Sequence, residues 1–381
     1  MKKICFVTTI YLTYRMFLKQ LSAYLYETGE YDISLICNQE PEIAEDLPEF
    51  VHYYPVKMER GVSLSAVSAI GDIKKILNEQ RFDIVQYSTP NAAFYTSIAA
   101  KKANIPVRLY CQWGIRYMGF EGWKRSLFKY LEKKTCDNST FIEAESHNIR
   151  NFSLSEGLYG EDRSCVIWNG SASGVDLTKF NISKRPQWRA EIRKQYGLAD
   201  DEVIYAFAGR LTADKGINEL LEAFLNITRK YQNAKLMIMG GMDNSASLNA
   251  NLMDQAKASG NVVFTGSVND IERYYAAADV FVAPSYREGF GLVVVEAEAM
   301  GLPAVVSDVP GQIDAIIPDK TGLACKVKDA AMLEQAMTRL LEDAALREKL
   351  GIAAAEFADK DFEQKKLFSY LKKHRDELAA Q

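Results

Sequence analysis

The sequence lacks the short patterns that usually mark metal sites and disulfide frameworks. None of its six cysteines lies in a Cys-x-x-Cys pair, and several lie in apolar segments, where a free thiol behaves as a small hydrophobe. Histidine is scarce, with only His52, His147 and His374. These absences argue against a disulfide framework or a zinc site, so we expect a reduced, cytoplasmic chain with no metal and no cofactor.

Long apolar runs and an excess of basic charge are also missing. No segment reaches the roughly 18 consecutive apolar residues of a transmembrane helix. The opening MKKICFVTTIYL is followed by no small-residue cleavage site and is typical of a first β-strand rather than a signal peptide. The formal net charge of −4 at pH 7 argues against nucleic acid as a partner.

Short β-rich runs alternate with segments of helical periodicity along most of the chain. Apolar Phe17, Leu21 and Leu25 share one helical face between the runs Ile4–Thr8 and Ile33–Cys37. Further β-rich runs occupy Asp83–Tyr87, Val107–Cys111, Val203–Ala208, Lys235–Met239, Val262–Thr265, Val280–Ala283 and Ala304–Ser307. Strands that alternate with helices indicate parallel sheets. The sequence therefore predicts an α/β protein with two Rossmann-like doubly wound domains, which bind ligands in the crevice between them at the carboxyl ends of the strands.

The length of 381 residues also favours two domains, at about 150 residues per domain. We expect an N-terminal domain over residues 1–172 and a C-terminal domain over residues 173–360. An apolar stripe from Leu333 to Leu341 predicts a helix capped by Asp329. Residues 361–381 are expected to form a final helix that crosses back to the N-terminal domain.

Two clusters carry the polar chemistry of the second half. In the first, Arg210 and Lys215 follow a predicted strand and are five residues apart, a spacing that suits a diphosphate. In the second, SYREGFGLVVVE from Ser285, a glycine-containing turn leads into a helix, and such a turn presents free amides to an anion. Glu288 would lie in that turn, and Glu296 could accept two hydrogen bonds from a ribose diol. Together the clusters predict a sugar-nucleotide site.

The neighbouring Glu298 lies about 200° around the predicted helix from Glu296. We therefore expect Glu298 to be solvated and to take no part in that site.

Here the residues match a family. GRL at 209, KG at 215 and EGFGLVVVE at 288 resemble the retaining GT-B glycosyltransferases of family 4. FTG at 264, YAAADVFVAPS at 275 and AMGLP at 299 support the resemblance, which is dense over residues 203–323. NGSASGVD at 169 and VPGQID at 309 resemble a bacterial branch that builds lipid-linked oligosaccharides and capsule or O-antigen repeats.

The resemblance implies roles for these residues. Arg210 and Lys215 would hold the donor diphosphate and stabilise the leaving group, while Glu288 would contact the transferred sugar. Glu296 would bind the ribose, and Val268 would make a main-chain contact to the base. The remaining donor-binding positions are Gly209, Gly289, Phe290, Gly291 and Leu292, with the amides of the last three directed at the phosphates.

The N-terminal half departs from the family pattern. Gln112-Trp113-Gly114 occupies the usual Glu-His-Gly position, so a mechanism that relies on that histidine is in doubt. We expect the acceptor to bind this half through five residues of its loops: Thr9, Tyr14, Arg15, Trp113 and Arg116. Tyr14 would pack against a sugar ring, and Arg15 or Arg116 would pair with an acceptor phosphate.

Residues 101–134 hold nine Lys and Arg against two Glu, interleaved with Trp and Phe. Such a segment suits an anionic membrane surface, and its apolar residues could equally pack a helix on to the first sheet. The only Asp-x-Asp, at Asp359, lies in the helical tail and is expected to be solvated, so we predict no metal.

These observations predict a retaining, metal-independent transfer of a sugar from a nucleotide-sugar, with UDP the family's commonest donor. The acceptor would be a saccharide, linked to polyprenyl diphosphate, at the inner face of the membrane. Two alternatives are a GT-B-shaped sugar-nucleotide epimerase and a non-catalytic binding protein. An epimerase would use more acid and base residues than this chain offers, and a binding protein would have little use for both carboxylates and both cations.

Overall fold

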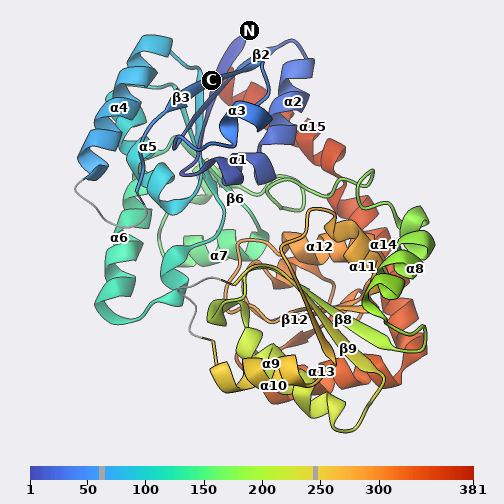
Figure 1. The fold of residues 1–381 in the computed structure, drawn as a ribbon. Helices are drawn as coiled ribbons and strands as arrows, with labels where there is room; N and C mark the ends of the chain where they lie inside the picture. The colour runs from blue at the N-terminus through green and yellow to red at the C-terminus, as the bar shows by residue number, and fades with distance from the viewer. Residues whose placement is uncertain (60–64, 243–247) are drawn as a thin grey trace. The chain divides into compact units, whose positions relative to one another are not determined.

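The computed structural model describes residues 1–59, 65–242 and 248–381 (Figure 1). These residues form two compact units. The first unit comprises Met1–Ser173 together with Lys365–Gln381, and the second comprises Gly174–Gln364. The end of the chain therefore belongs to the same unit as its beginning.

The first unit is built on a parallel sheet, which has seven strands within the described residues, in the order β3-β2-β1-β4-β5-β6-β7. The strands are β1 (Lys2–Val7), β2 (Tyr31–Cys37), β3 (Val51–Pro55), β4 (Ile84–Tyr87), β5 (Val107–Gln112), β6 (Phe141–Ala144) and β7 (Ser164–Cys165). The helices are α1 (Tyr11–Phe17), α2 (Lys19–Glu27), α3 (Ile43–Asp46), α4 (Ser65–Gln80), α5 (Pro90–Lys102), the 3₁₀ turn η1 (Arg116–Gly119), α6 (Gly122–Asn138), α7 (His147–Ser155) and α15 (Gln364–Ala379).

Helix α15 is part of the first core. Figure 1 shows it, in red, beside the blue α2, and the ring centroids of Phe368 and Tyr24 lie 5.7 Å apart. Leu367 and Leu371 of α15 are buried with Leu21 of α2 in one apolar cluster. Burying such side chains stabilises the unit by roughly 1.5–3 kcal/mol each, which holds the last helix on the first unit.

The second unit repeats the architecture, with six parallel strands in the described residues, in the order β10-β9-β8-β11-β12-β13. These are β8 (Val203–Ala208), β9 (Ala234–Met239), β10 (Val262–Gly266), β11 (Val280–Ala283), β12 (Ala304–Ser307) and β13 (Gly322–Cys325). Its helices are α8 (Arg185–Tyr196), the 3₁₀ turn η4 (Ala213–Lys215), α9 (Ile217–Thr228), α10 (Ala250–Ala258), α11 (Ile271–Ala277), α12 (Leu292–Ala299), α13 (Ala330–Glu342) and α14 (Ala344–Phe362). The predicted pair of doubly wound parallel sheets is confirmed.

Local sequence signals explain several helix ends. The Asp329 carboxylate accepts a 2.9 Å hydrogen bond from the Met332 amide, so the predicted cap of α13 is confirmed. Helix α14 was not predicted, and α15 begins at Gln364 rather than within residues 361–363. Within the described residues, no helix combines the length and the apolar composition needed to cross a membrane.

Candidate functional site

In the second sheet, the order in which the chain adds strands reverses between β8 and β11. The chain adds β9 and β10 on one side of β8 and then returns to place β11 and β12 on the other. Loops that leave the carboxyl ends of such neighbouring strands diverge, and the crevice between them binds ligands in open α/β sheets. The two loops at this point are residues 209–216 and residues 284–291, which carry both sequence clusters.

A glycine brings the two loops into contact. Gly216 has φ +73°, in the left-handed region, and a Cβ there would lie 2.1 Å from the Pro284 carbonyl oxygen. The Tyr286 amide donates a 2.9 Å hydrogen bond to the Asp214 carbonyl. Only glycine permits this approach, and it sets the 3₁₀ turn that carries Lys215 against the second loop.

The predicted cation and carboxylate meet across this contact. Lys215 Nζ lies 2.5 Å from Glu288 Oε1, and both side chains are about one-fifth exposed. Arg210 is exposed at the end of β8. The structure therefore places an ammonium, a carboxylate and a guanidinium at one sheet edge, a set that can bind a diphosphate and a sugar hydroxyl together.

Two further residues join the loops, and the sequence analysis missed both. Arg287 pairs with Asp214 at 3.2 Å, and the Asp214 carboxylate also accepts a 2.6 Å hydrogen bond from the Thr212 hydroxyl. Charges next to Lys215 and Glu288 in sequence were a signal that could have identified them. They position the catalytic candidates by tying η4 to the second loop.

The predicted phosphate-binding turn is partly closed by its own backbone. Gly291 precedes α12, and a Cβ there would lie 2.9 Å from the Ala315 Cβ. The Leu292 amide, expected to face the phosphates, donates instead to the Phe290 carbonyl at 2.9 Å, because the chain turns tightly before α12. Phe290 is buried against Phe362, with ring centroids 5.2 Å apart. This turn therefore offers fewer free amides than expected.

Glu296 lies on α12 and is half-buried. Burial raises the pKa of its carboxyl to about 7, with the Lys179 ammonium acting to lower it and the Glu272 carboxylate to raise it. Such a carboxyl gains most from hydrogen-bond donors, and a ribose diol supplies two.

The prediction that Glu298 is solvated is wrong. Its side chain is fully buried, and neither carboxylate oxygen makes a hydrogen bond of normal geometry within the described residues. Burial raises its pKa well above the usual range, although the nearby Thr321 hydroxyl acts to lower it. Helix α12 is covered on that side by protein, a fact that the helical angle alone does not reveal.

The other donor candidates follow the carboxyl ends of strands in the second sheet. Gly209 follows β8, and its carbonyl oxygen would lie 1.8 Å from a Cβ on Gly240, so the loop after β9 packs directly on it. Gly289 follows Glu288, and its carbonyl approaches Gly311 closely. Val268 follows β10, at the outer edge of the sheet, and is half-buried.

In the first unit, the order in which the chain adds strands reverses between β1 and β4. Thr9 follows β1, and its hydroxyl lies 3.1 Å from the hydroxyl of Thr89, which follows β4. Trp113 follows β5 and packs on Phe17 with ring centroids 5.2 Å apart. Thr9 and Trp113 therefore follow β1 and β5, which lie on either side of β4. Thr89, which follows β4, is a polar group that the sequence analysis did not single out.

The prediction for Tyr14 is wrong. The segment 11–17 is helix α1 rather than a loop, and Tyr14 points into the core with no exposed surface. Its ring packs beside Tyr11, at 5.8 Å between centroids, so it cannot stack on a sugar. Arg15, one residue on, faces solvent on the same helix. Arg116 lies in η1, and its guanidinium carbon is 4.6 Å from the Phe128 ring centroid.

No group of three or more His, Cys, Asp or Glu side chains in the part of the chain that the structure describes is arranged to hold a metal ion. The absence of a metal requirement stays a prediction, because a metal can also be held by fewer protein ligands together with substrate phosphates.

Comparisons with known proteins assign the chain to a family. The family model described as "Glycosyl transferases group 1" matches residues 189–357, and "Glycosyl transferase 4-like" matches residues 3–146. The capsular polysaccharide biosynthesis glycosyltransferase CapM of Staphylococcus aureus is 29% identical over 320 residues, which cover 84% of this chain and 83% of CapM.

A second relative is the N,N'-diacetylbacillosaminyl-diphospho-undecaprenol alpha-1,3-N-acetylgalactosaminyltransferase of Campylobacter jejuni. It is 30% identical over 295 residues, which cover 75% of each chain. Among solved structures, Anabaena HepE in complex with UDP has a TM-score of 0.80 at 17% identity, covering 99% of this chain and 100% of HepE. These findings do not support the epimerase alternative. The chain belongs to the group 1, family 4-like glycosyltransferases and has their GT-B fold.

Proposed function

We propose that the chain transfers a sugar, with retention of anomeric configuration and without a metal, from a UDP-sugar to a saccharide linked to polyprenyl diphosphate. The observation that carries the proposal is the Lys215–Glu288 contact at the switch point of the second sheet. The capsule assignment of the Staphylococcus aureus relative and the diphospho-undecaprenol acceptor of the Campylobacter jejuni relative support the pathway class. The UDP bound to HepE supports the donor class.

In the proposed mechanism the donor diphosphate binds Arg210 and Lys215. As the bond between the anomeric carbon and the phosphate oxygen breaks, negative charge grows on that oxygen, and the fixed cations stabilise it. The acceptor hydroxyl attacks from the same face and passes its proton to the departing phosphate oxygen. This route needs no histidine base, in keeping with Gln112-Trp113-Gly114 in the first unit.

Product stereochemistry tests the reaction. A product with the anomeric configuration of the donor, determined by NMR, is the expected result. A product of inverted configuration would contradict the proposal, whatever the donor sugar.

Substitution tests the two cations. We expect Arg210→Ala and Lys215→Ala each to cost about 2–4 kcal/mol of transition-state stabilisation, the effect of removing one oxyanion donor. The loss should appear as a lower kcat because the negative charge on the leaving phosphate develops during the reaction. Arg229→Ala and Lys230→Ala, which remove exposed cations near the end of α9, are the matched controls. Normal turnover by both site variants would place the diphosphate elsewhere.

The two glutamates are distinguished by calorimetry with UDP alone. Glu296→Ala should weaken UDP binding by about 1.5–3 kcal/mol, the usual value of hydrogen bonds to a charged group. Glu288→Ala should leave UDP binding almost intact and reduce sugar transfer, since its proposed partner is the sugar. Equal losses of UDP affinity would contradict these roles.

For the acceptor, we propose a site on the first unit that uses Thr9, Arg15, Trp113 and Arg116. A lipid-linked acceptor requires the enzyme to work at a membrane surface. We propose that an anionic membrane binds α6, whose exposed side chains include Trp123, Leu127 and Tyr130.

A further inference from the structure

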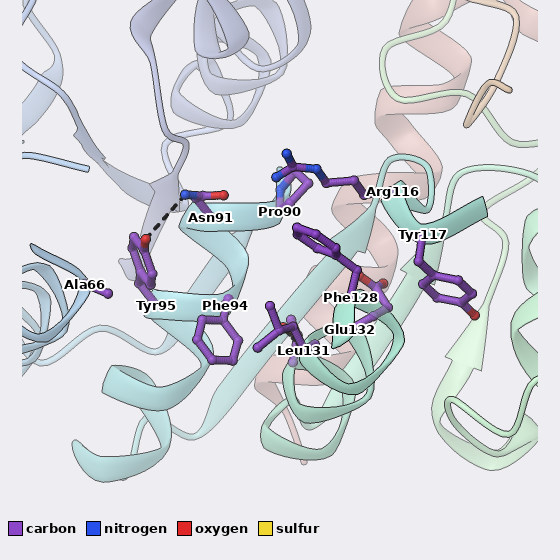
Figure 2. A pocket seen from close by; sticks show the side chains of 11 residues that line it. Ala66, Pro90, Asn91, Phe94, Tyr95, Arg116, Tyr117, Phe128, Leu131 and Glu132 are labelled. Carbon is purple, nitrogen blue, oxygen red and sulfur yellow. Dashed lines mark hydrogen bonds between the residues drawn. The ribbon is translucent and has the colours of Figure 1, made fainter. Parts of the chain in front are cut away.

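An apolar cavity of about 80 Å³ lies in the first unit beside α4, α5 and α6 (Figure 2). Figure 2 shows Phe94 of α5 facing Leu131 and Phe128 of α6, with Arg116 above them at the edge. Pro90 is exposed, and Phe94, Phe128 and Leu131 are half-buried, so the cavity opens on to the surface. Apolar ligand surface that enters such a cavity is removed from water, which favours the binding of an apolar ligand.

The charged groups of the lining favour an anion at the rim. Arg116 lies over the Phe128 ring at 4.6 Å and over Phe120 at 5.9 Å. The other charged residue, Glu132, is buried and accepts hydrogen bonds from Tyr110 (2.9 Å) and Gln112 (2.7 Å). Burial raises the pKa of Glu132, with these two hydrogen bonds acting to lower it. Arg116 is the cation of the lining, and it lies at the mouth of the cavity.

We infer that this cavity binds the phosphate-proximal end of an isoprenoid chain, with Arg116 pairing with the attached phosphate. A hydrocarbon next to a phosphate matches an apolar cavity with a guanidinium at its rim. The inference rests on the proposed transfer to a lipid-linked acceptor, and it assigns the place where that lipid is recognised.

The geometry of α6 connects the cavity with the proposed membrane surface. Phe128 and Leu131 line the cavity, while Trp123, Leu127 and Tyr130 lie on the exposed side of the same helix. Leu127 and Leu131 are one helical turn apart and join the two apolar surfaces. An isoprenoid chain that leaves the membrane beside α6 would meet Leu127 first and then Leu131 at the cavity.

Direct binding tests the cavity without any transfer reaction. Farnesyl phosphate, measured by calorimetry with the full chain, is expected to bind more tightly than farnesol or inorganic phosphate. Leu131→Trp should fill the cavity from α6, and Ala66→Leu should fill it from α4. Two variants are used so that the cavity can still be tested if one of them fails to fold. Each excluded methylene costs about a factor of four in affinity, so the exclusion of between one and two methylenes should weaken binding roughly tenfold. Lys102→Trp, on the exposed end of α5, is the matched control and should bind as the wild type does.

Three binding results would overturn the inference. Inorganic phosphate binding as tightly as farnesyl phosphate would show that the isoprenoid adds nothing to the affinity. Unchanged binding by both filled variants would show that the isoprenoid binds outside this cavity. Loss of binding to phosphatidylglycerol vesicles by Leu131→Trp would show that the cavity takes bulk membrane lipid rather than the acceptor.

Transfer assays separate this inference from the proposed function. With polyprenyl-diphosphate acceptor, Leu131→Trp should raise the KM by roughly tenfold, and with a short soluble acceptor its turnover should be that of the wild type. Equal effects on both acceptors would overturn the inference. Failure of the wild type to use any lipid-linked acceptor would contradict the proposed function. The binding of farnesyl phosphate to the cavity would still be decided by calorimetry alone.

Discussion

Glu296 and Glu298 lie two residues apart on α12 and have different surroundings. Glu296 reaches the half-buried edge where the nucleotide is proposed to bind, and Glu298 points into the core without a well-formed hydrogen bond. Both carboxyls have a raised pKa because protein replaces water around them. Only Glu296 has a proposed ligand to compensate that cost.

Replacing Glu298 with Met should stabilise the second unit. The folded-state pKa is raised above the usual 4.5, so the folded chain keeps a proton that the unfolded chain loses, and stability falls as pH rises above about 4.5. We expect a gain of about 1–3 kcal/mol at pH 8, the cost of an unsatisfied buried polar group, and a smaller gain at pH 5. Urea unfolding at both pH values measures this, with exposed Glu222→Met as the control. A less stable Glu298→Met at both values would show that the carboxyl serves the fold.

Nucleotide affinity should depend on the protonation of Glu296. With a pKa of about 7, the carboxyl is mostly ionised at pH 8 and mostly protonated at pH 6. If the ribose binds the carboxylate, binding weakens as pH falls through 7, by up to roughly tenfold at pH 6. Calorimetry with UDP on the wild type and on Glu296→Gln separates this effect from titration of UDP itself. Identical pH profiles for the two proteins would exclude Glu296 as the ionising group.

At the scale of elements, some cations of α6 form ion pairs within the first unit and others lie over exposed aromatic rings. Arg125 and Lys129 pair with Glu156 at 3.0 and 2.7 Å, which ties α6 to the residue that follows α7. Lys124 and Lys134 lie over the rings of Trp123 and Tyr130 on the exposed side. The basic excess of residues 101–134 is thus partly used within the unit.

Removal of the exposed apolar side chains should therefore release the protein from anionic vesicles. We expect Trp123→Ala, Leu127→Ala and Tyr130→Ala together to abolish sedimentation with phosphatidylglycerol vesicles, because these side chains supply the apolar contact. Neutralising Lys124 and Lys134 should weaken binding by about 1 kcal/mol each and reduce its salt sensitivity. Ile352→Ser, which removes an exposed apolar side chain of the second unit, is the control. Full vesicle binding by the triple variant would assign membrane contact to another surface.

At the scale of the whole chain, the last helix completes the first unit. Arg375 of α15 is buried and donates to both oxygens of Glu143 at 3.1 Å and to the Gln86 side chain at 2.7 Å. His374 Nδ1 lies 2.6 Å from the same carboxylate. Burial alone would raise the pKa of Glu143, but Arg375 and His374 outweigh it and bring it to about 2.

Arg375→Met should destabilise the first unit because it leaves the Glu143 charge buried with a weaker partner. We expect a loss of about 3–5 kcal/mol at pH 7. The folded-state pKa is depressed, so this stability is present above about 4.5 and is lost as pH falls towards 2. The difference in stability between the variant and the wild type should therefore shrink as pH falls from about 4.5 towards 2.

Tryptophan fluorescence follows the first unit through Trp113, Trp123 and Trp168 in a Trp188→Phe background, since Trp188 belongs to the second unit. An unchanged free energy of unfolding in Arg375→Met would mean that α15 is held by its apolar contacts alone.

Sequence patterns were sufficient where a local rule decides the outcome. Short β-rich runs located most strands, and apolar residues at helical spacing located several helices. Asp329 was recognisable as a cap because capping depends on the next three residues. Arg210, Lys215 and Glu288 were assigned to one site because each follows the end of a parallel strand, where neighbouring loops meet.

Tertiary packing decided what the sequence left undetermined. Tyr14 was predicted to contact a sugar and Glu298 to be solvated, but both side chains are buried. Arg375 donates to Glu143 and Gln86, which are more than 230 residues away in the chain. The lining of the cavity comes from segments that only the fold brings together, among them α4, α5 and α6. Hydrophobic pattern determines which face of an element turns inward. Whether a polar group on that element reaches solvent, a partner or neither depends on what the rest of the chain places over it.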